Sequence, residues 1–182
     1  QNKRFTRVEP RRIKMAIKNI ERDSETIIDY KLKNLAWNDH PYNDKRTVWK
    51  QAVKTSEQKK KLGGKRPDYT LYPTGSNEPI AVIEVKKRGA NIHEALSQAE
   101  DYARKIDAPI VFATDGVFTK TLHIKYNKPL LLNHEEIDDL IKETLALRFL
   151  ETFEVNTLDK RVIKSRGELI SVFSSVNDLL RE

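Results

Sequence analysis

Apolar side chains that recur at helical spacing predict five helices along the chain. The second of these helices begins with Ser24 as its N-cap and turns Ile28 and Leu32 inward. The third begins with Asn91 and Glu94, which together resemble a capping box. The predicted helices span residues 11–20, 24–35, 91–106, 135–150 and 168–180.

Short apolar runs bounded by turn residues predict five strands, at residues 47–53, 68–72, 80–86, 110–113 and 121–126. Gly75 and the two residues after it mark a turn, so the second and third strands are expected to form an antiparallel hairpin. Residues 56–66 are predicted to be a loop with Gly63 and Gly64 at its tip. This order of helices and strands, with a crossover helix before the fourth strand, predicts an α/β sandwich with a mixed central β-sheet flanked by helices.

Positive charge is concentrated in one segment of the chain, whose overall net charge is +7. Between Lys45 and Arg66 there are nine lysines and arginines and a single acid, Glu57, so this segment carries nine minus one, or +8. A charge gathered in one place is typical of a surface that binds a polyanion such as DNA, whereas a solubilising charge is spread out. The alternative interpretation is a solvated loop.

Several classes of protein are excluded by the composition. The chain has no cysteine, which rules out disulfides, thiolate zinc sites and cysteine nucleophiles. No apolar run approaches the roughly 20 residues that a membrane helix needs, and the N-terminus carries no apolar signal segment. We therefore expect a cytoplasmic protein with no membrane partner.

The predicted strand at residues 80–86 ends in a carboxylate and an ammonium group. Because strand side chains alternate, Glu84 and Lys86 share one face. Asp68 begins the other arm of the hairpin and can therefore come close to Glu84. Two converging carboxylates make an oxygen-rich site suited to Mg²⁺, with the Val85 carbonyl as a further candidate ligand. The alternative is a structural ion pair between Glu84 and Lys86, with Asp68 unrelated to it.

Pro67-Asp68, followed after fifteen residues by Glu84-Val85-Lys86 on an apolar strand, resembles the motif of the PD-(D/E)xK nucleases. The sequence from residue 84 to residue 102 resembles the nuclease domain of type I restriction enzymes. Residues 110–116 resemble the next strand and turn of that family. The resemblance implies a restriction-endonuclease-like fold and hydrolysis of double-stranded DNA with Mg²⁺, for which Mn²⁺ is expected to substitute.

Five residues would carry that chemistry. Asp68 and Glu84 would bind the metal, and Lys86 would orient the attacking water or stabilise charge on the phosphate. Gln98 and Tyr102 match a Gln-x-x-x-Tyr element that the family carries on the helix after the catalytic strand. They would contact the phosphate or hold Lys86, whereas the alternative gives Tyr102 a place in the core and lets Gln98 cap a buried backbone group.

Two further sets of residues belong to the predicted site. Family members have an early helix with an acidic residue that faces the metal, and Glu21 and Glu25 are both candidates because they lie four apart on one helical face. The spacing does not decide between them. The residues predicted to contact DNA are Lys59, Lys60, Lys61, Lys65, Arg66, Lys87 and Arg88.

The chain length of 182 residues fits one domain with an appendage. We assign residues 1–150 to the nuclease domain and residues 151–182 to a C-terminal helical extension that leads to a following domain. Residues 168–181 resemble the entry into the helical domain of restriction-system adenine methyltransferases, which would make the parent a fused restriction-modification enzyme. The alternatives are a type I motor subunit with a helicase after the nuclease, and a simple closing helix. The expected partners are the methyltransferase or helicase motor and the specificity domains or subunits of one restriction system.

Two functions are compatible with these features. The first is an endonuclease module, and the second is a catalytically silent nucleic-acid-binding domain that keeps the nuclease fold. Clustered carboxylates repel phosphate unless a cation lies between them, so a binding-only domain has no need of Asp68 and Glu84. The complete set of Asp68, Glu84, Lys86 and Gln98 therefore favours the endonuclease.

Overall fold

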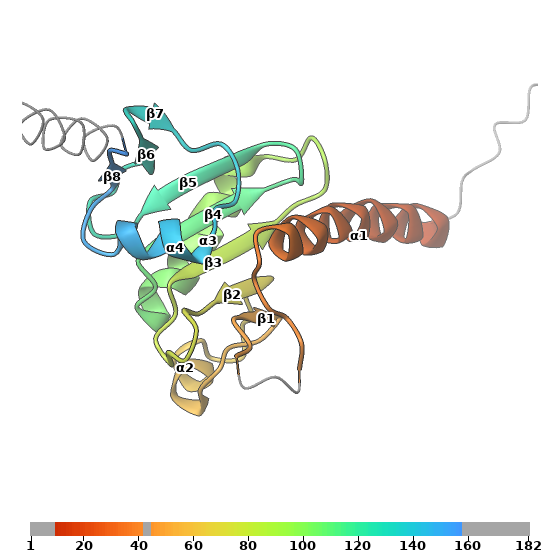
Figure 1. Cartoon of the computed structure of the whole chain (residues 1–182). Coiled ribbons are helices and arrows are strands. Elements are labelled where there is room, and N and C mark those ends of the chain that lie inside the picture. The colour runs from red at the N-terminus through yellow and green to blue at the C-terminus, as the bar shows by residue number, and fades with distance from the viewer. Residues whose placement is uncertain (1–9, 42–44, 158–182) are drawn as a thin grey trace, which may run out of the picture.

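A five-stranded mixed sheet lies at the centre of the protein, and the computed structural model describes residues 10–41 and 45–157 (Figure 1). The strand order is β1-β2-β3-β4-β5, in which β3 and β4 run parallel and every other neighbouring pair is antiparallel. The strands are β1 (Val48–Lys50), β2 (Tyr69–Leu71), β3 (Ala81–Val85), β4 (Ile110–Thr114) and β5 (Thr119–His123). The predicted α/β sandwich with a mixed sheet and the predicted hairpin of β2 and β3 are confirmed.

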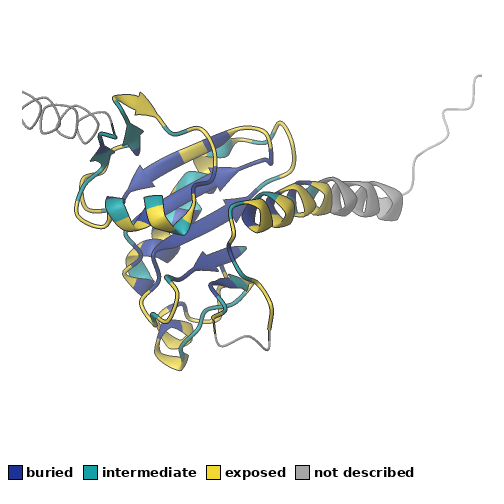
Figure 2. Ribbon diagram, in the orientation of Figure 1, coloured by how far each residue is buried: buried dark blue, intermediate teal, exposed yellow. Residues whose placement is uncertain are grey.

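Each face of the sheet has its own hydrophobic core, because strand side chains alternate between the two faces. Helix α3 (Ile92–Ile106), the crossover between β3 and β4, covers one face and packs Ala99, Tyr102 and Ala103 against Val82 and Val111. The other face is covered by the second half of α1 (Pro10–Asn34) and by α4 (Glu143–Ala146) with the 3-10 turn η1 (Leu147–Phe149). Figure 2 shows the buried sheet between these more exposed layers.

Helix α1 is a single element, whereas the sequence pattern predicts two helices with a break before Ser24. Ser24 lies inside α1 and is buried, so it is not an N-cap. The three residues before it contain no glycine or proline that would end a helix, and its small side chain lets α1 pack closely against the protein. Ile28 and Leu32 face the core as predicted.

The prediction of a loop at residues 56–66 is also wrong for its first half, because these residues form helix α2 (Ser56–Lys61). Thr55 caps this helix by accepting a hydrogen bond from the backbone N–H of Gln58, and the Gln58 side chain accepts one from the Thr55 backbone N–H. This capping box stabilises a helix too short to form on hydrophobic periodicity alone. Gly63 and Gly64 follow with positive φ, so the turn predicted there is present.

A continuous helix at residues 135–150 is likewise wrong. Asn133 and His134 have positive φ and turn the chain from β6 (Leu131–Leu132) back into β7 (Glu135–Glu136). The apolar residues after that turn pack on the main core from a loop and from the short α4. Strand β8 (Glu154–Val155) completes a small sheet in the order β7-β6-β8.

The predicted C-terminal extension begins at residue 151, and β8 lies within it but pairs with β6 of the preceding domain. The helix predicted at residues 168–180 and its resemblance to a methyltransferase domain lie outside the described residues. Within residues 10–41 and 45–157, no helix is both long and apolar enough to cross a membrane.

Candidate active site

The β2–β3 ladder brings two acidic residues together. Thr70 pairs with Val82 and Tyr69 with Ile83, so the same register continued toward the ends of these strands sets Asp68 opposite Glu84. Residues directly opposite in an antiparallel pair have Cβ atoms about 4.5–5.5 Å apart. Both carboxylates therefore lie at the end of the sheet where β3 finishes, on the face that α3 covers.

A chain of hydrogen bonds leads from Glu84 to α3. The Lys86 ammonium donates to Glu84 Oε1 at 2.8 Å and to Gln98 Oε1 at 3.1 Å. The Gln98 side-chain amide in turn donates to the Tyr102 hydroxyl at 3.0 Å. Gln98 and Tyr102 lie four residues apart, on the flank of α3 that faces the end of β3. The structure thus places four of the five predicted catalytic residues in one network, with Asp68 across the ladder from Glu84.

Burial makes both carboxylates of the site harder to ionise. Burial raises the pKa of Glu84 to about 7, with the negative charge of Asp68 as the next cause, and the hydrogen bond from Lys86 opposes both. Burial also raises the pKa of Asp68, against the backbone N–H of Val85, which donates to its Oδ2 at 2.7 Å. Although burial lowers the pKa of Lys86, its contacts with Glu84 and the nearby acids hold that pKa above the ordinary value.

The donor atoms fit a hard divalent cation. Glu84 is 3% exposed, and its Oε2 atom is buried with no hydrogen-bond partner among the described residues. In the continued register Val85 lies opposite Pro67, which has no backbone N–H to donate to the Val85 carbonyl. The described residues hold no preformed group of three or more acidic or histidine side chains around a metal position. The protein would therefore supply two carboxylates and a carbonyl and leave the remaining positions to water, as is usual for Mg²⁺.

Glu21 and Glu25 of α1 are distinguished by their surroundings. Glu25 forms an ion pair with Lys50 at 3.1 Å, and its charge raises the pKa of Asp68 more than the charge of Glu21 does. Glu21 raises the pKa of Asp68 and of Glu84, so its charge reaches both carboxylates. Both acids therefore act on Asp68, and Glu21 is the one whose charge also acts on Glu84.

A second network beside the site was not predicted from the sequence. The Tyr69 hydroxyl donates to Asp29 Oδ1 at 2.7 Å, and Lys50 donates to Asp29 Oδ2 at 2.9 Å. With the Lys50–Glu25 ion pair, these contacts tie α1 to β1 and β2. The only signal in the sequence is the spacing of Glu25 and Asp29 by four residues, because the partners on the strands come from the fold.

The predicted DNA-contacting residues divide into two groups. Lys59, Lys60 and Lys61 lie on α2, and Lys61 pairs with Asp107 just after α3 at 2.9 Å. This is the end of the sheet where β3 begins, opposite the end that carries Glu84. Residues nearer the site are Lys65, which lies 3.8 Å from Asp101 on α3, Arg66 next to Pro67, and Lys87 and Arg88, which directly follow Lys86.

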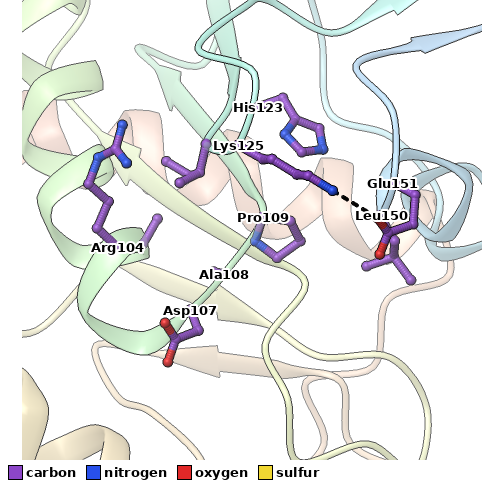
Figure 3. Close-up of a pocket in the computed structure, with 10 residues that line it drawn as sticks. Arg104, Asp107, Ala108, Pro109, His123, Lys125, Leu150 and Glu151 are labelled. Atoms are coloured by element: carbon purple, nitrogen blue, oxygen red, sulfur yellow. Dashed lines mark hydrogen bonds and ion pairs between the residues drawn. The ribbon is translucent and has the colours of Figure 1, made fainter.

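A hollow of about 410 Å³ lies where β4 begins and β5 ends, which is the opposite end of the sheet from Glu84. Figure 3 shows residues that line it. Pro109, directly before β4, lines it together with His123 at the end of β5. His123 Nε2 lies 2.8 Å from the Phe149 carbonyl oxygen, and Lys125 forms an ion pair with Glu151 at 3.1 Å. The hollow contains none of the predicted site residues.

The mixed sheet flanked by α1 and α3 is of the restriction-endonuclease-like class. Residues 12–129 match the family model of the type I restriction enzyme R protein N terminus, and the chain therefore belongs to this family. The structure resembles that of a fragment assigned to the HsdR subunit of a type I restriction enzyme from Vibrio vulnificus YJ016, with a TM-score of 0.51 and 20% sequence identity. The match covers 70% of this chain and 24% of that one, so the chain spans about a quarter of its structural relative. No curated protein sequence matches the chain.

Proposed function

We propose that this chain is the DNA-cleaving domain of a type I restriction enzyme and hydrolyses phosphodiester bonds of double-stranded DNA with Mg²⁺. The observation that carries the proposal is the pair of buried carboxylates, Asp68 and Glu84, whose raised pKa values call for a positive charge between them. Membership of the R protein N-terminal family supports the same kind of function.

Asp68, Glu84 and the Val85 carbonyl would hold the metal. When bound, Mg²⁺ polarises a phosphate oxygen and lowers the pKa of a bound water, and Mn²⁺ is expected to substitute for it. Glu21 would face the same centre from α1, directly or through water. The Lys86 ammonium, fixed between Glu84 and Gln98, is placed to orient that water or to stabilise negative charge on the phosphate.

Gln98 and Tyr102 act as positioning residues in this proposal. Gln98 accepts a hydrogen bond from Lys86 and donates one to Tyr102, so the two side chains restrict where the ammonium group lies. Lys65, Arg66, Lys87 and Arg88 would contact the DNA backbone near the cleaved bond. A catalytically silent domain is disfavoured, because without a cation the two carboxylates would repel the phosphates that such a domain must bind.

Membership of this family supports a larger assembly. A type I R protein carries a helicase motor, and we propose such a motor and the specificity and methyltransferase subunits as partners, in the cytoplasm where the DNA lies. The family match favours a motor subunit over a fused methyltransferase as the parent.

The test compares plasmid cleavage by the parent chain and by Glu84→Gln and Asp68→Asn variants, each within the whole restriction enzyme. Cleavage is expected to require Mg²⁺ or Mn²⁺, to fail in Ca²⁺, and to fall by orders of magnitude in both variants while both stay folded. If the Glu84→Gln variant cleaves DNA at the parental rate, Asp68 and Glu84 are not the reaction site.

A further inference from the structure

The turn between β4 and β5 presents two exposed apolar side chains beside the candidate active site. Phe118 is 71% exposed and Val117 is 45% exposed, and we call these two residues the apolar tip. Ile27 of α1, itself 41% exposed, lies against Gly116, where an added Cβ atom would come within 3.3 Å of it. Apolar side chains gathered in one place on a surface typically mark a site of interaction.

The tip is held rigidly. Asp115 Oδ1 accepts hydrogen bonds from the backbone N–H groups of Val117 at 3.0 Å and Phe118 at 2.9 Å. The Phe118 carbonyl accepts from the Thr114 hydroxyl at 2.9 Å, and Gly116 has the positive φ that this tight turn requires. Because the backbone of the turn is satisfied by its own contacts, Phe118 is exposed on a fixed support, and ordering it against a partner costs little entropy.

Two hydrogen bonds connect the base of the tip to the end of β3 and the residues after it. The Lys86 backbone N–H donates to the Thr114 carbonyl at 2.8 Å, the Gly89 N–H donates to Asp115 Oδ2 at 3.0 Å, and Asp115 holds the tip as described. Burial raises the pKa of Asp115. The backbone N–H groups of Phe118, Gly89 and Val117 and the charge of Arg88 outweigh burial and hold that pKa below its usual range. Arg88 therefore lies near the base of the tip.

We propose that the apolar tip inserts between base pairs of the DNA duplex next to the bond to be cleaved, with Phe118 as the wedge. This inference rests on the proposed nuclease function. Proteins that bend DNA insert apolar side chains, phenylalanine among them, between base steps, and cations at the base of the wedge hold the phosphates. A protein partner is the less suitable occupant, because Lys120 follows the tip by two residues on β5 and the charge of Arg88 acts on Asp115 beneath it. Lysine is depleted in the centre of protein interfaces.

The test measures binding of the chain, in Ca²⁺, to two short duplexes that differ in one central mismatch. A wedge must unstack a base step, and the mismatch has already lost part of that stacking energy. We expect the parent chain to bind the mismatched duplex about tenfold more tightly than the paired one. A 2-aminopurine base beside the central step is expected to brighten when the chain binds.

Phe118→Ala is expected to bring the two affinities together and to abolish the 2-aminopurine signal. The slope of log K against log salt is expected to stay unchanged, because the phosphate contacts remain. Phe118→Leu, which keeps an apolar wedge, is expected to retain the preference. The matched control is Leu150→Ala, since Leu150 is 39% exposed but lines the hollow at the opposite end of the sheet.

The wedge is overturned if the parent chain shows no preference for the mismatched duplex, or if the Phe118→Ala variant keeps that preference. The apolar tip would then be a contact site for a protein partner. Plasmid cleavage in Mg²⁺ by the whole restriction enzyme is measured alongside. Normal cleavage without a mismatch preference overturns the wedge alone. A mismatch preference in a chain whose whole restriction enzyme never cleaves DNA supports the wedge and overturns the proposed nuclease function.

Discussion

Asp68 Oδ2 accepts a hydrogen bond at 2.7 Å from the backbone N–H of Val85, the residue after Glu84, and the negative charge of Asp68 raises the pKa of the buried Glu84. Lys86 neutralises only part of this charge, since it donates to Glu84 Oε1 and leaves Oε2 without a partner among the described residues. A divalent cation between the carboxylates would remove both the repulsion and the unsatisfied oxygen.

The first prediction concerns stability in the absence of metal. The pKa of Glu84 is about 7 in the fold against an ordinary value of 4.5. Because the folded value is the higher one, Glu84 favours folding most below the ordinary pKa, and this contribution is lost as the pH rises through about 7. The difference between these two pKa values corresponds to roughly 3 kcal/mol.

Glu84→Gln is therefore expected to stabilise the metal-free chain relative to the parent at about pH 8, with a much smaller difference at about pH 5. Urea unfolding in EDTA at both pH values measures this difference. Added Mg²⁺ is expected to stabilise the parent and to leave the variant unchanged. A difference between variant and parent that does not depend on pH would contradict the assignment.

The second prediction separates metal binding from catalysis. Lys86→Met removes the ammonium that donates to Glu84, so cleavage is expected to fall by orders of magnitude. Mn²⁺ affinity, measured by calorimetry, is expected to hold or to rise, because no cation then competes for Glu84. Loss of Mn²⁺ binding in a folded Lys86→Met variant would instead make Lys86 part of the architecture of the site.

The third prediction concerns the helix that holds Lys86. Gln98→Ala and Tyr102→Phe are expected to reduce the cleavage rate by about ten- to a hundredfold, less than loss of a metal ligand, because only positioning is impaired. Lys105→Ala is the matched control, since Lys105 lies on the same helix and pairs with Asp101 on its exposed side. A Gln98→Ala variant that unfolds at lower temperature but cleaves at the parental rate would show that Gln98 serves the fold alone.

The fourth prediction distinguishes the two helical acids. Glu21→Gln is expected to weaken Mn²⁺ binding and cleavage, whereas Glu25→Gln, which breaks the ion pair with Lys50, is expected to lower stability with a smaller effect on metal binding. Calorimetry and thermal unfolding on both variants measure the two effects. The reverse pattern would place Glu25 at the metal.

The fifth prediction concerns the DNA surface. Each phosphate contact contributes about −0.9 to the slope of log K against log salt for duplex DNA. Replacing Lys65, Lys87 and Arg88 by alanine is expected to flatten that slope by up to about three units. The matched triple at Lys59, Lys60 and Lys61 is expected to change it little, because α2 lies at the other end of the sheet. If the second triple flattens the slope more than the first, the prediction is wrong, and the basic segment from Lys45 to Arg66 contacts DNA through α2.

Much of the fold was predictable because period-two and helical patterns are long and clear in β3 and α3. The same alternation predicts that Glu84 and Lys86 share a face, and the hairpin brings Asp68 to Glu84. Helix α2 depends on a local capping box at Thr55 and Gln58, a signal present in the sequence but independent of hydrophobic periodicity. The pattern at residues 135–150 resembles a helix because loop residues there also pack into the core.

The contacts that the sequence could not predict join elements far apart in the chain. Tyr69 reaches Asp29 only because β2 lies beside α1, and Lys50 reaches the same acid from β1. The position of Lys59, Lys60 and Lys61 is of the same kind, since it depends on the packing of α2 against the end of α3. Spacing along the chain specifies which side chains share an element, whereas these distances follow from tertiary packing.

The most direct test of the central claim is the anomalous diffraction of a crystal of this chain soaked in Mn²⁺. The account predicts a single strong peak within about 2.0–2.3 Å of carboxylate oxygens from both Asp68 and Glu84, with Glu84 Oε2 among them and the Val85 carbonyl beside it. The same soak of Glu84→Gln crystals is expected to show no peak there. A parent crystal that cleaves DNA after it is dissolved but binds no Mn²⁺ between Asp68 and Glu84 would contradict the account.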